Sequence, residues 1–347
     1  METPAGSGGW RWWTPLAPLR RGIARHETLL WWLHSAYVLA LGTGIMWLGG
    51  RNFSWLRYSG FYILIIWISS VFLVEVVQSR EGVWWNRARL VVNYVNKNLY
   101  QQLLFFILPI YAGSATLRSG NILFVIVLGA SAVLSTIDIV YDRFVSIRRT
   151  LSAWFFAFNV FAVVNVALPV LFGISTHRAL RVGTLAAVVG FVTIAWRLSR
   201  LRHGRAWIGI VAGAALLVWA TESMRPFVPP APLRLLSADF GLGLDARALR
   251  VTDPVPALPP RFEGRIFFVT AVRAPLGLKD RVELRWYRGS RLLSASAPHD
   301  IAGGRREGFR LWSALVIRPG GGEGPLRLDV VTEAGQLVGR ATLFARR

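Results

Sequence analysis

Apolar runs close to 20 residues long limit the folds open to this chain more than any other feature of its sequence. In a helix, about 20 apolar residues cover the roughly 30 Å hydrocarbon core of a bilayer. Seven such runs occur before residue 225, at 29–48, 59–77, 99–116, 122–141, 152–174, 180–196 and 206–224. They predict an all-α membrane bundle of about seven transmembrane helices.

Composition agrees with a membrane protein and excludes several other classes. Hydrophobic residues make up 54% of the chain, which is high for a soluble domain. The absence of cysteine excludes disulfides, thiol nucleophiles and cysteine-ligated metals. A net charge of +22 would suggest nucleic-acid binding in a soluble protein. Here the basic residues flank the apolar runs, where they meet lipid headgroups, so we expect a lipid bilayer as partner and no nucleic acid.

The chain changes character after residue 224, where a proline-rich stretch cannot continue a helix. Beyond it, short alternating segments separated by glycine and proline turns predict a small all-β, immunoglobulin-like sandwich, with Trp286 in its core. Seven strands are expected, at 247–252, 265–273, 281–287, 291–296, 309–317, 326–332 and 337–345. The predicted organisation is a basic N-terminus (1–27), a transmembrane helical domain (28–224), a proline-rich linker (225–246) and the sandwich (247–347).

The distribution of basic residues predicts the orientation in the membrane. The segments between the apolar runs form two alternating sets, one with 15 Lys and Arg and the other with 7. Because cytoplasmic segments carry the excess of positive charge, the N-terminus is expected in the cytoplasm. Seven spans would then place the sandwich in the periplasm, which makes this a multi-pass inner-membrane protein.

Polar side chains within apolar runs are candidate functional residues because burying them in lipid is costly. Four of them fall toward the cytoplasmic side of the predicted bundle: His34, Glu75, Gln101 and Asp138. Together they would form a pocket for a proton, a cation or a lipid headgroup. In the alternative interpretation each side chain lies within a turn of the interface, where it snorkels or caps a helix.

Three further patterns in the helical region each allow more than one interpretation. Asp138 and Asp142 share a helix face and would suit Mg²⁺, although the arginines that follow also fit a helix end of mixed charge. Asn159 and Asn165 are expected to form hydrogen bonds between helices. Residues 83–98 fit either an interfacial amphipathic helix or an extension of the next apolar helix.

In the predicted sandwich, Arg305, Arg306 and Arg310 surround a Gly-Gly pair and form a candidate anion-binding patch. A solvated loop is the other interpretation. The sequence contains no recognisable catalytic constellation or metal-binding motif, so we expect neither a cofactor nor enzymatic activity.

The chain resembles an uncharacterised bacterial family in five stretches. Three of them resemble the C-terminal domain of that family: Trp286–Arg291, Ile301–Ser313 and Leu326–Arg340. The other two resemble its helical region: Asn98–Pro109 and Leu134–Asp138. Members are proteobacterial multi-span membrane proteins that end in a β-sandwich of unknown function. They tend to have histidine directly before the Arg-Trp pair, where this chain has Leu284. The resemblance implies an architecture but no reaction.

Two functions remain open from the sequence. The first is a binding or scaffolding component of the cell envelope, whose periplasmic sandwich contacts an envelope protein, a lipid or an anionic polymer. The alternative is a membrane-embedded transporter or lipid-modifying enzyme that uses the polar residues of the bundle.

Overall fold

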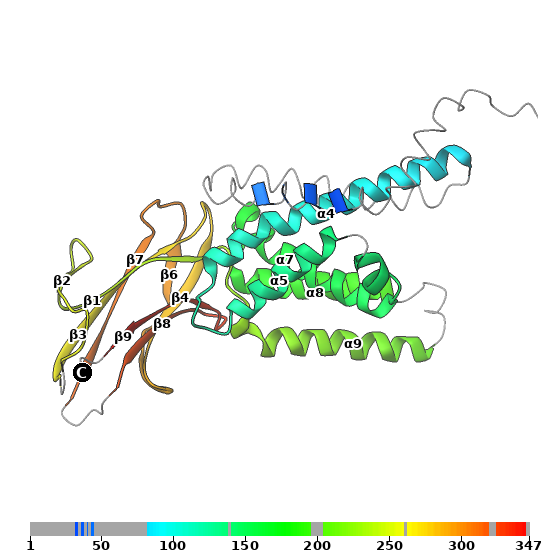
Figure 1. Ribbon diagram of the computed structural model, residues 1–347. Helices are drawn as coiled ribbons and strands as arrows, with labels where there is room; N and C mark the ends of the chain where they lie inside the picture. Colours follow the sequence, from blue (N-terminus) through cyan, green and yellow to red (C-terminus); the bar gives the residue numbers. More distant parts are fainter. Residues whose placement is uncertain are drawn as a thin grey trace, which may run out of the picture.

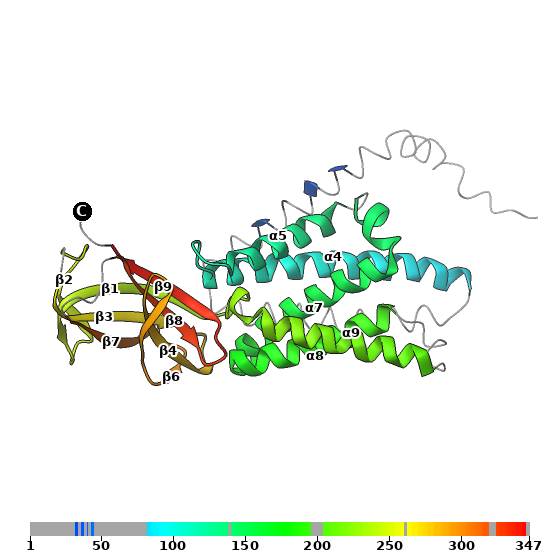
Figure 2. The same ribbon diagram turned by 90° about the horizontal axis from the view of Figure 1, so that it is seen from below.

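A computed structural model of the protein describes residues 32–33, 36–37, 40, 43–44, 82–137, 140–195, 204–259, 262–318 and 324–344. Over these ranges a helical part is followed by a β part, and the two pack end to end (Figures 1 and 2). His34, Glu75 and Asp138 lie outside the described residues, as does nearly all of the first two apolar runs.

The described helical part contains five α-helices, one π-helical turn and one 3-10 turn. These are α4 (Val83–Ser114), α5 (Ile122–Thr136), η2 (Tyr141–Ser146), α7 (Arg149–Phe172), α8 (Thr176–Ala195), α9 (Gly204–Ser223) and η4 (Arg225–Phe227). Helix α4 is continuous, so residues 83–98 extend the apolar helix that follows them. Helices α7 and α8 approach closely at Gly183, where an added Cβ would lie 3.3 Å from the Phe161 carbonyl oxygen.

The predicted bundle of seven membrane-spanning helices is wrong. Among the described residues one helix, Thr150–Phe172, is long and apolar enough to cross a membrane, while the apolar helices Ile122–Thr136 and Trp207–Ser223 are shorter. Even in the long helix, 61% of the apolar window is buried inside the protein. An apolar run has the same composition in a buried core helix as in a membrane span, so its length alone could not separate the two.

Two apolar clusters hold the helices together, one among α4, α5 and α7 and the other among α7, α8 and α9. The buried Tyr111 hydroxyl donates to the Ala162 carbonyl oxygen (3.0 Å) and so ties α4 to α7. Within α7, the Asn159 side-chain amide donates to the Phe155 carbonyl oxygen of its own helix at 2.8 Å. A hydrogen bond between helices was predicted for Asn159, but its amide N–H group donates within α7 instead.

The β part is a sandwich of two antiparallel sheets. One sheet has the strand order β2-β1-β3-β7 and the other β5-β4-β8-β9, with β6 also paired to β4. The strands are β1 (Arg234–Asp245), β2 (Arg250–Pro254), β3 (Gly264–Arg273), β4 (Lys279–Arg288), β5 (Arg291–Ala295), β6 (His299–Ala302), β7 (Phe309–Ile317), β8 (Leu326–Thr332) and β9 (Leu337–Leu343).

The predicted alternation of β4 is confirmed: Val282, Leu284 and Trp286 are fully buried between the sheets. The Trp286 indole N–H donates to the Ser313 hydroxyl at 3.0 Å and so satisfies the polar atom of the core tryptophan. The sequence did not predict β1 and β6. Strand β1 falls in the range assigned to the linker, where the prolines that precede it mask the inward-facing Ala238 and Phe240.

Candidate functional site

The helical part and the sandwich meet in a junction built on buried polar contacts. The Asp280 side chain on β4 is buried, and its carboxylate accepts hydrogen bonds from the backbone N–H of Thr176 (2.9 Å) and from the Thr176 hydroxyl (2.6 Å). Thr176 is the first residue of α8. A carboxylate at this position satisfies a free N–H and interacts favourably with the positive end of the helix dipole.

Three more hydrogen bonds cross the junction from other elements. The Asn121 amide donates to the Leu337 carbonyl oxygen (3.2 Å), and the Gln336 amide donates to the Val228 carbonyl oxygen (3.1 Å). Arg340 holds Asp329 through two hydrogen bonds and also donates to the Arg118 carbonyl oxygen (3.3 Å). The turns at this end of the helices are therefore fixed to the sandwich.

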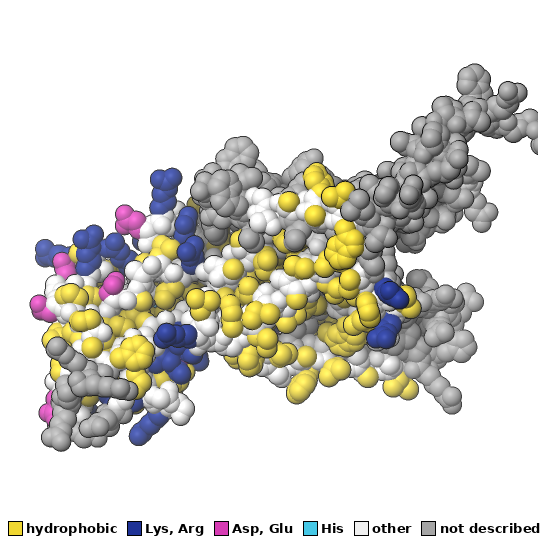
Figure 3. Space-filling view, viewed as in Figure 1, with side chains coloured by type: hydrophobic (Ala, Val, Ile, Leu, Met, Phe, Trp, Pro, Cys, Tyr) yellow, Lys and Arg dark blue, Asp and Glu magenta, His cyan; other side chains and the backbone are white. Residues whose placement is uncertain are grey.

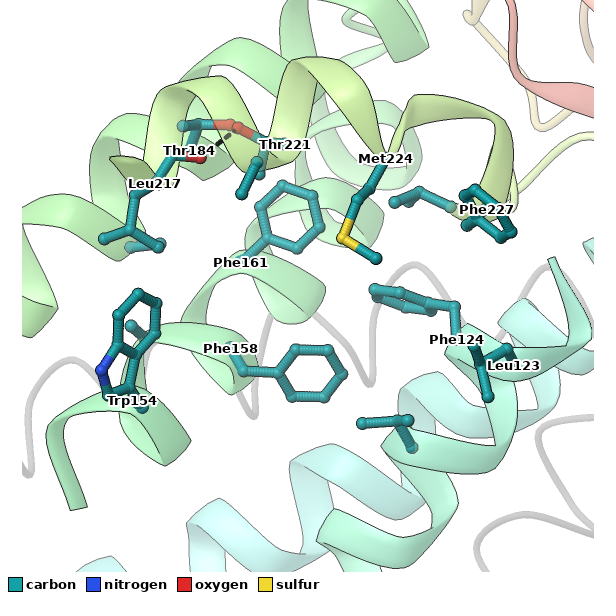
Figure 4. A pocket seen from close by; sticks show the side chains of 15 residues that line it. Leu123, Phe124, Trp154, Phe158, Phe161, Thr184, Leu217, Thr221, Met224 and Phe227 are labelled. Carbon is teal, nitrogen blue, oxygen red and sulfur yellow. Dashed lines mark hydrogen bonds between the residues drawn. The ribbon is translucent and has the colours of Figure 1, made fainter. Parts of the chain in front are cut away.

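An apolar pocket of about 300 Å³ lies between the helices (Figure 4). Four helices and the segment after α9 line it. The lining residues are Leu123, Phe124 and Val127 of α5; Trp154, Ala157, Phe158 and Phe161 of α7; Thr184 and Ala187 of α8; Leu217, Ala220 and Thr221 of α9; and Met224, Phe227 and Val228.

The two threonines leave the pocket wall apolar because their hydroxyls are used within their own helices. The Thr184 hydroxyl donates to the Leu180 carbonyl oxygen (2.9 Å) and that of Thr221 to the Leu217 carbonyl oxygen (2.8 Å). A ligand in the pocket would therefore find hydrocarbon and aromatic surface with few polar atoms. This chemistry suits an apolar chain and offers no group for acid–base catalysis.

The pocket opens sideways between α5 and α9. Leu123 and Val127 on one flank and Met224 and Phe227 on the other are exposed. Large apolar side chains are exposed on both helices beyond the opening, among them Ile126 on α5 and Ile208, Val211 and Trp219 on α9. In Figure 3, hydrophobic side chains cover the middle of the helical part, whereas charged side chains gather over the sandwich and the junction.

Basic side chains lie at the end of the pocket nearest the sandwich. Arg225 lies between the lining residues Met224 and Phe227, and it pairs with Glu222. Burial lowers the pKa of His177, and the positive charges of Arg181 and Arg225 lower it further. These three groups therefore lie close enough to act on one another. The His177 Nδ1 and Arg225 Nε atoms are buried and have no hydrogen-bond partner among the described residues.

Of the four polar residues predicted to form a cluster, the structure describes Gln101. Its side chain is buried, and its amide donates to the Ser135 carbonyl oxygen, which links α4 to α5. The Gln101 Oε1 atom has no hydrogen-bond partner within the described ranges. The cluster with His34, Glu75 and Asp138 stays a prediction.

The predicted arginine patch lies in the loop between β6 and β7 and at the start of β7. Arg305 and Arg306 are exposed, and the Arg305 guanidinium carbon lies 5.2 Å from the centre of the Phe309 ring. Arg310 donates to the Ala248 carbonyl oxygen (2.9 Å) and lies 3.5 Å from the Glu307 carboxylate. Arg310 is thus partly engaged within the protein, and anion binding by the three arginines stays a prediction.

Sequence reasoning missed both the pocket and the junction. The pocket had a local signal, since Trp154, Phe158 and Phe161 repeat at helical spacing on one face of α7. The junction had none, because Thr176 and Asp280 are 104 positions apart. In the part of the chain that the structure describes, no group of three histidine or carboxylate side chains is placed to hold a metal ion.

Fold and site together define an α-helical protein with an apolar pocket and a β-sandwich fixed to one end of its helices. The chain belongs to a family of unknown function, DUF5924, which matches residues 23–256. Residues 279–342 match a second family of unknown function, DUF2914. The first match ends after β2 and the second begins at β4, so strands from both matched regions make up the sandwich.

No curated protein matches the chain. Among solved structures, an immunoglobulin-like protein from Pseudomonas aeruginosa is similar, with 10% sequence identity and a TM-score of 0.22. The match covers 33% of this chain and 98% of that protein.

Proposed function

We propose that the protein is a membrane-embedded binding component of the cell envelope that holds a lipid acyl chain in its helical pocket. The observation that carries this proposal is the opening of an apolar pocket through an exposed apolar surface. Large apolar side chains that are exposed together on neighbouring helices are typical of contact with a membrane or a partner. If this surface contacts a bilayer, lipid chains would reach the pocket directly from the membrane, without passing through water.

The positions of the basic residues support the membrane location. Arg118, Arg178 and Arg225 lie at the junction end of the helices, in or beside the turns that contact the sandwich. Arg143 and Arg148 lie near the opposite ends of α5 and α7. Helix α7 has 24 residues, which gives a length of about 36 Å. Apolar surface between two basic ends matches a bilayer with its two headgroup layers.

In this proposal the helices lie in the inner membrane and the sandwich lies on its periplasmic side. That orientation rests on the excess of basic residues in the segments away from the sandwich. The sandwich then works as a rigidly held binding domain, because the contact between Asp280 and Thr176 and the hydrogen bonds around it leave little freedom at the junction. Its exposed Arg305 and Arg306 are the groups that would meet an anionic envelope partner.

Photo-crosslinking tests the pocket. The full chain is reconstituted into phosphatidylcholine vesicles that contain a phosphatidylcholine analogue with a photoactivatable acyl chain. After irradiation, modified positions are mapped by mass spectrometry. Crosslinks are expected on the pocket-facing residues of α7, including Phe158 and Phe161.

A matched pair of variants on α9 separates pocket binding from general lipid contact. Ala220→Phe fills the pocket from a partly exposed lining position, and Ala215→Phe adds the same ring at an exposed position outside it. Ala220→Phe is expected to remove most crosslinking at Phe158 and Phe161, while Ala215→Phe leaves it unchanged. Equal crosslinking in both variants would show that the pocket does not hold the chain.

A further inference from the structure

The pocket has a chemically distinct end, and this end indicates which lipid it takes. Along α7 the lining runs from Trp154 to Phe161, a separation of seven positions and therefore about 10 Å of helix. A volume of about 300 Å³ is at the small end for ligand pockets and suits one chain better than a whole phospholipid. The headgroup would therefore remain outside, at an end of the pocket.

The end nearest the sandwich carries an excess of positive charge. Helix α8 places His177, Arg181 and Thr184 along one side, with Thr184 in the pocket wall. Arg225 is the first residue of η4, just after α9, and follows the lining residue Met224. Leu180 and Val228 belong to one buried cluster, so the first turns of α8 pack against the segment that carries Arg225. Burial and the positive charge of Arg181 both lower the pKa of Arg225, in agreement with this packing.

The carboxylates near this end already have partners. Glu222 pairs with Arg225, Glu333 lies 3.7 Å from Arg281, and Asp280 accepts the hydrogen bonds of Thr176. Arg181 is exposed and has no ion-pair partner within the described part of the chain. The buried Nε atom of Arg225 also lacks a hydrogen-bond acceptor there. An anion between Arg181 and Arg225 would supply that acceptor and offset the repulsion between the two groups.

We propose that the pocket binds an anionic phospholipid, with one acyl chain among α5, α7 and α9 and the phosphate against Arg181 and Arg225. This inference rests on the proposed function, because it assigns a headgroup to the lipid whose chain the pocket holds. A second copy of the chain or a peptide helix fits less well. A volume of about 300 Å³ is too small for a helix about 10 Å across, and the basic end of the pocket favours a negative group beside an apolar one.

The test repeats the crosslinking with two photoactivatable lipids of identical chains, one with a phosphatidylglycerol and one with a phosphatidylcholine headgroup. Each is added in trace amount to phosphatidylcholine vesicles that contain the full chain. The yield at Phe158 and Phe161 is expected to be roughly five-fold higher for phosphatidylglycerol. Arg181→Gln should bring the ratio of the two yields close to one. Arg291→Gln, which removes the same charge from an exposed position at the start of β5, should leave the ratio unchanged.

The outcomes separate this inference from the proposed function. Equal yields for the two lipids, both abolished by Ala220→Phe, would overturn the headgroup assignment and leave chain binding intact. A ratio that persists in the double variant Arg181→Gln, Arg225→Gln would also overturn it. If Ala220→Phe changes neither yield, chain binding fails and the headgroup assignment fails with it.

Discussion

The Asp280 carboxylate caps helix α8 from another part of the chain, accepting hydrogen bonds from both the backbone N–H and the hydroxyl of Thr176. Most helices are capped by a residue just before their first turn. Here the sandwich supplies the capping group, so α8 reaches its full stability only when the sandwich is docked. The helix that the sandwich caps also lines the pocket, through Thr184 and Ala187.

Asp280→Ala is expected to lower the free energy of unfolding by about 2 kcal/mol, because it removes both a helix cap and a favourable interaction between charge and dipole. Chemical denaturation of the full chain in detergent measures this loss. Tryptic cleavage after Arg118, in a turn that the sandwich contacts, should become faster. Asp300→Ala removes an exposed carboxylate that pairs with Arg281 and should cost much less. Equal losses in the two variants would contradict a capping role for Asp280.

Gly173 ends α7 with a positive φ of 66°, and an added Cβ there would lie 2.5 Å from the Gly277 carbonyl oxygen of the sandwich. Gly173→Ala should therefore destabilise the protein by about 2 kcal/mol or more, through backbone strain and through the clash at the junction. Gly335 also has a positive φ, but the space around it is open. Gly335→Ala therefore measures the effect of backbone strain alone. If its melting temperature falls as far as that of Gly173→Ala, the clash at the junction does not contribute.

The sequence was sufficient where structure follows from local alternation. The side chains of Val282, Leu284 and Trp286 alternate with polar ones, and all three are in the core of the sandwich as predicted. Strand β1 escaped prediction because prolines precede it and its glycines weaken the alternation around Phe240. In the described ranges the helices lie where the apolar runs predicted them. The runs did not correctly predict that each helix spans a membrane. The apolar face of α7 packs largely against other helices, and composition does not distinguish protein neighbours from lipid.

The candidate site was harder to predict because its parts come together only through the tertiary fold. Trp154, Phe158 and Phe161 form a visible stripe on α7, yet whether such a stripe fills a core or borders a pocket depends on the volume of the facing side chains. The pocket wall also contains the small Ala187 and Ala220, which come from the next two helices, α8 and α9. In the sequence, Arg181 and Arg225 are simply basic residues beside apolar runs. Only the fold places both of them at one end of the pocket.

Trp286 anchors the sandwich core, and its hydrogen bond to Ser313 allows a graded test. Ser313→Ala leaves the buried indole N–H without an acceptor and should cost about 1–3 kcal/mol. Trp286→Ala should cost more, about 3–5 kcal/mol, since it also leaves a cavity. Trp312→Ala, on the exposed face of β7, should cost about 1 kcal/mol or less. Chemical denaturation measures these losses in the free energy of unfolding. A loss in Trp312→Ala as large as that in Trp286→Ala would contradict the assignment of Trp286 to the core and Trp312 to the surface.

His177 should make stability depend on pH. Burial lowers its pKa, and so do the positive charges of Arg181 on α8 and Arg225 on η4, while the carboxylates of Glu333 and Asp280 oppose the shift. The unfolded chain then binds a proton near pH 6.5, where free histidine titrates, before the folded protein does. Stability from this residue is therefore fully present above about pH 6.5 and is lost as the pH falls through the folded-state pKa.

His177→Gln removes this titration and should flatten the decline in melting temperature between about pH 7 and pH 5. The measurement is a series of thermal melts of the wild type and the variant in the same detergent, at constant ionic strength. Parallel curves for the two proteins would mean that His177 does not drive the acid-side loss. Because His177 lies beside Arg181 and Arg225, its protonation at low pH also adds positive charge at the end of the pocket. The same acidification that weakens the fold should therefore strengthen binding of an anionic lipid relative to a zwitterionic one.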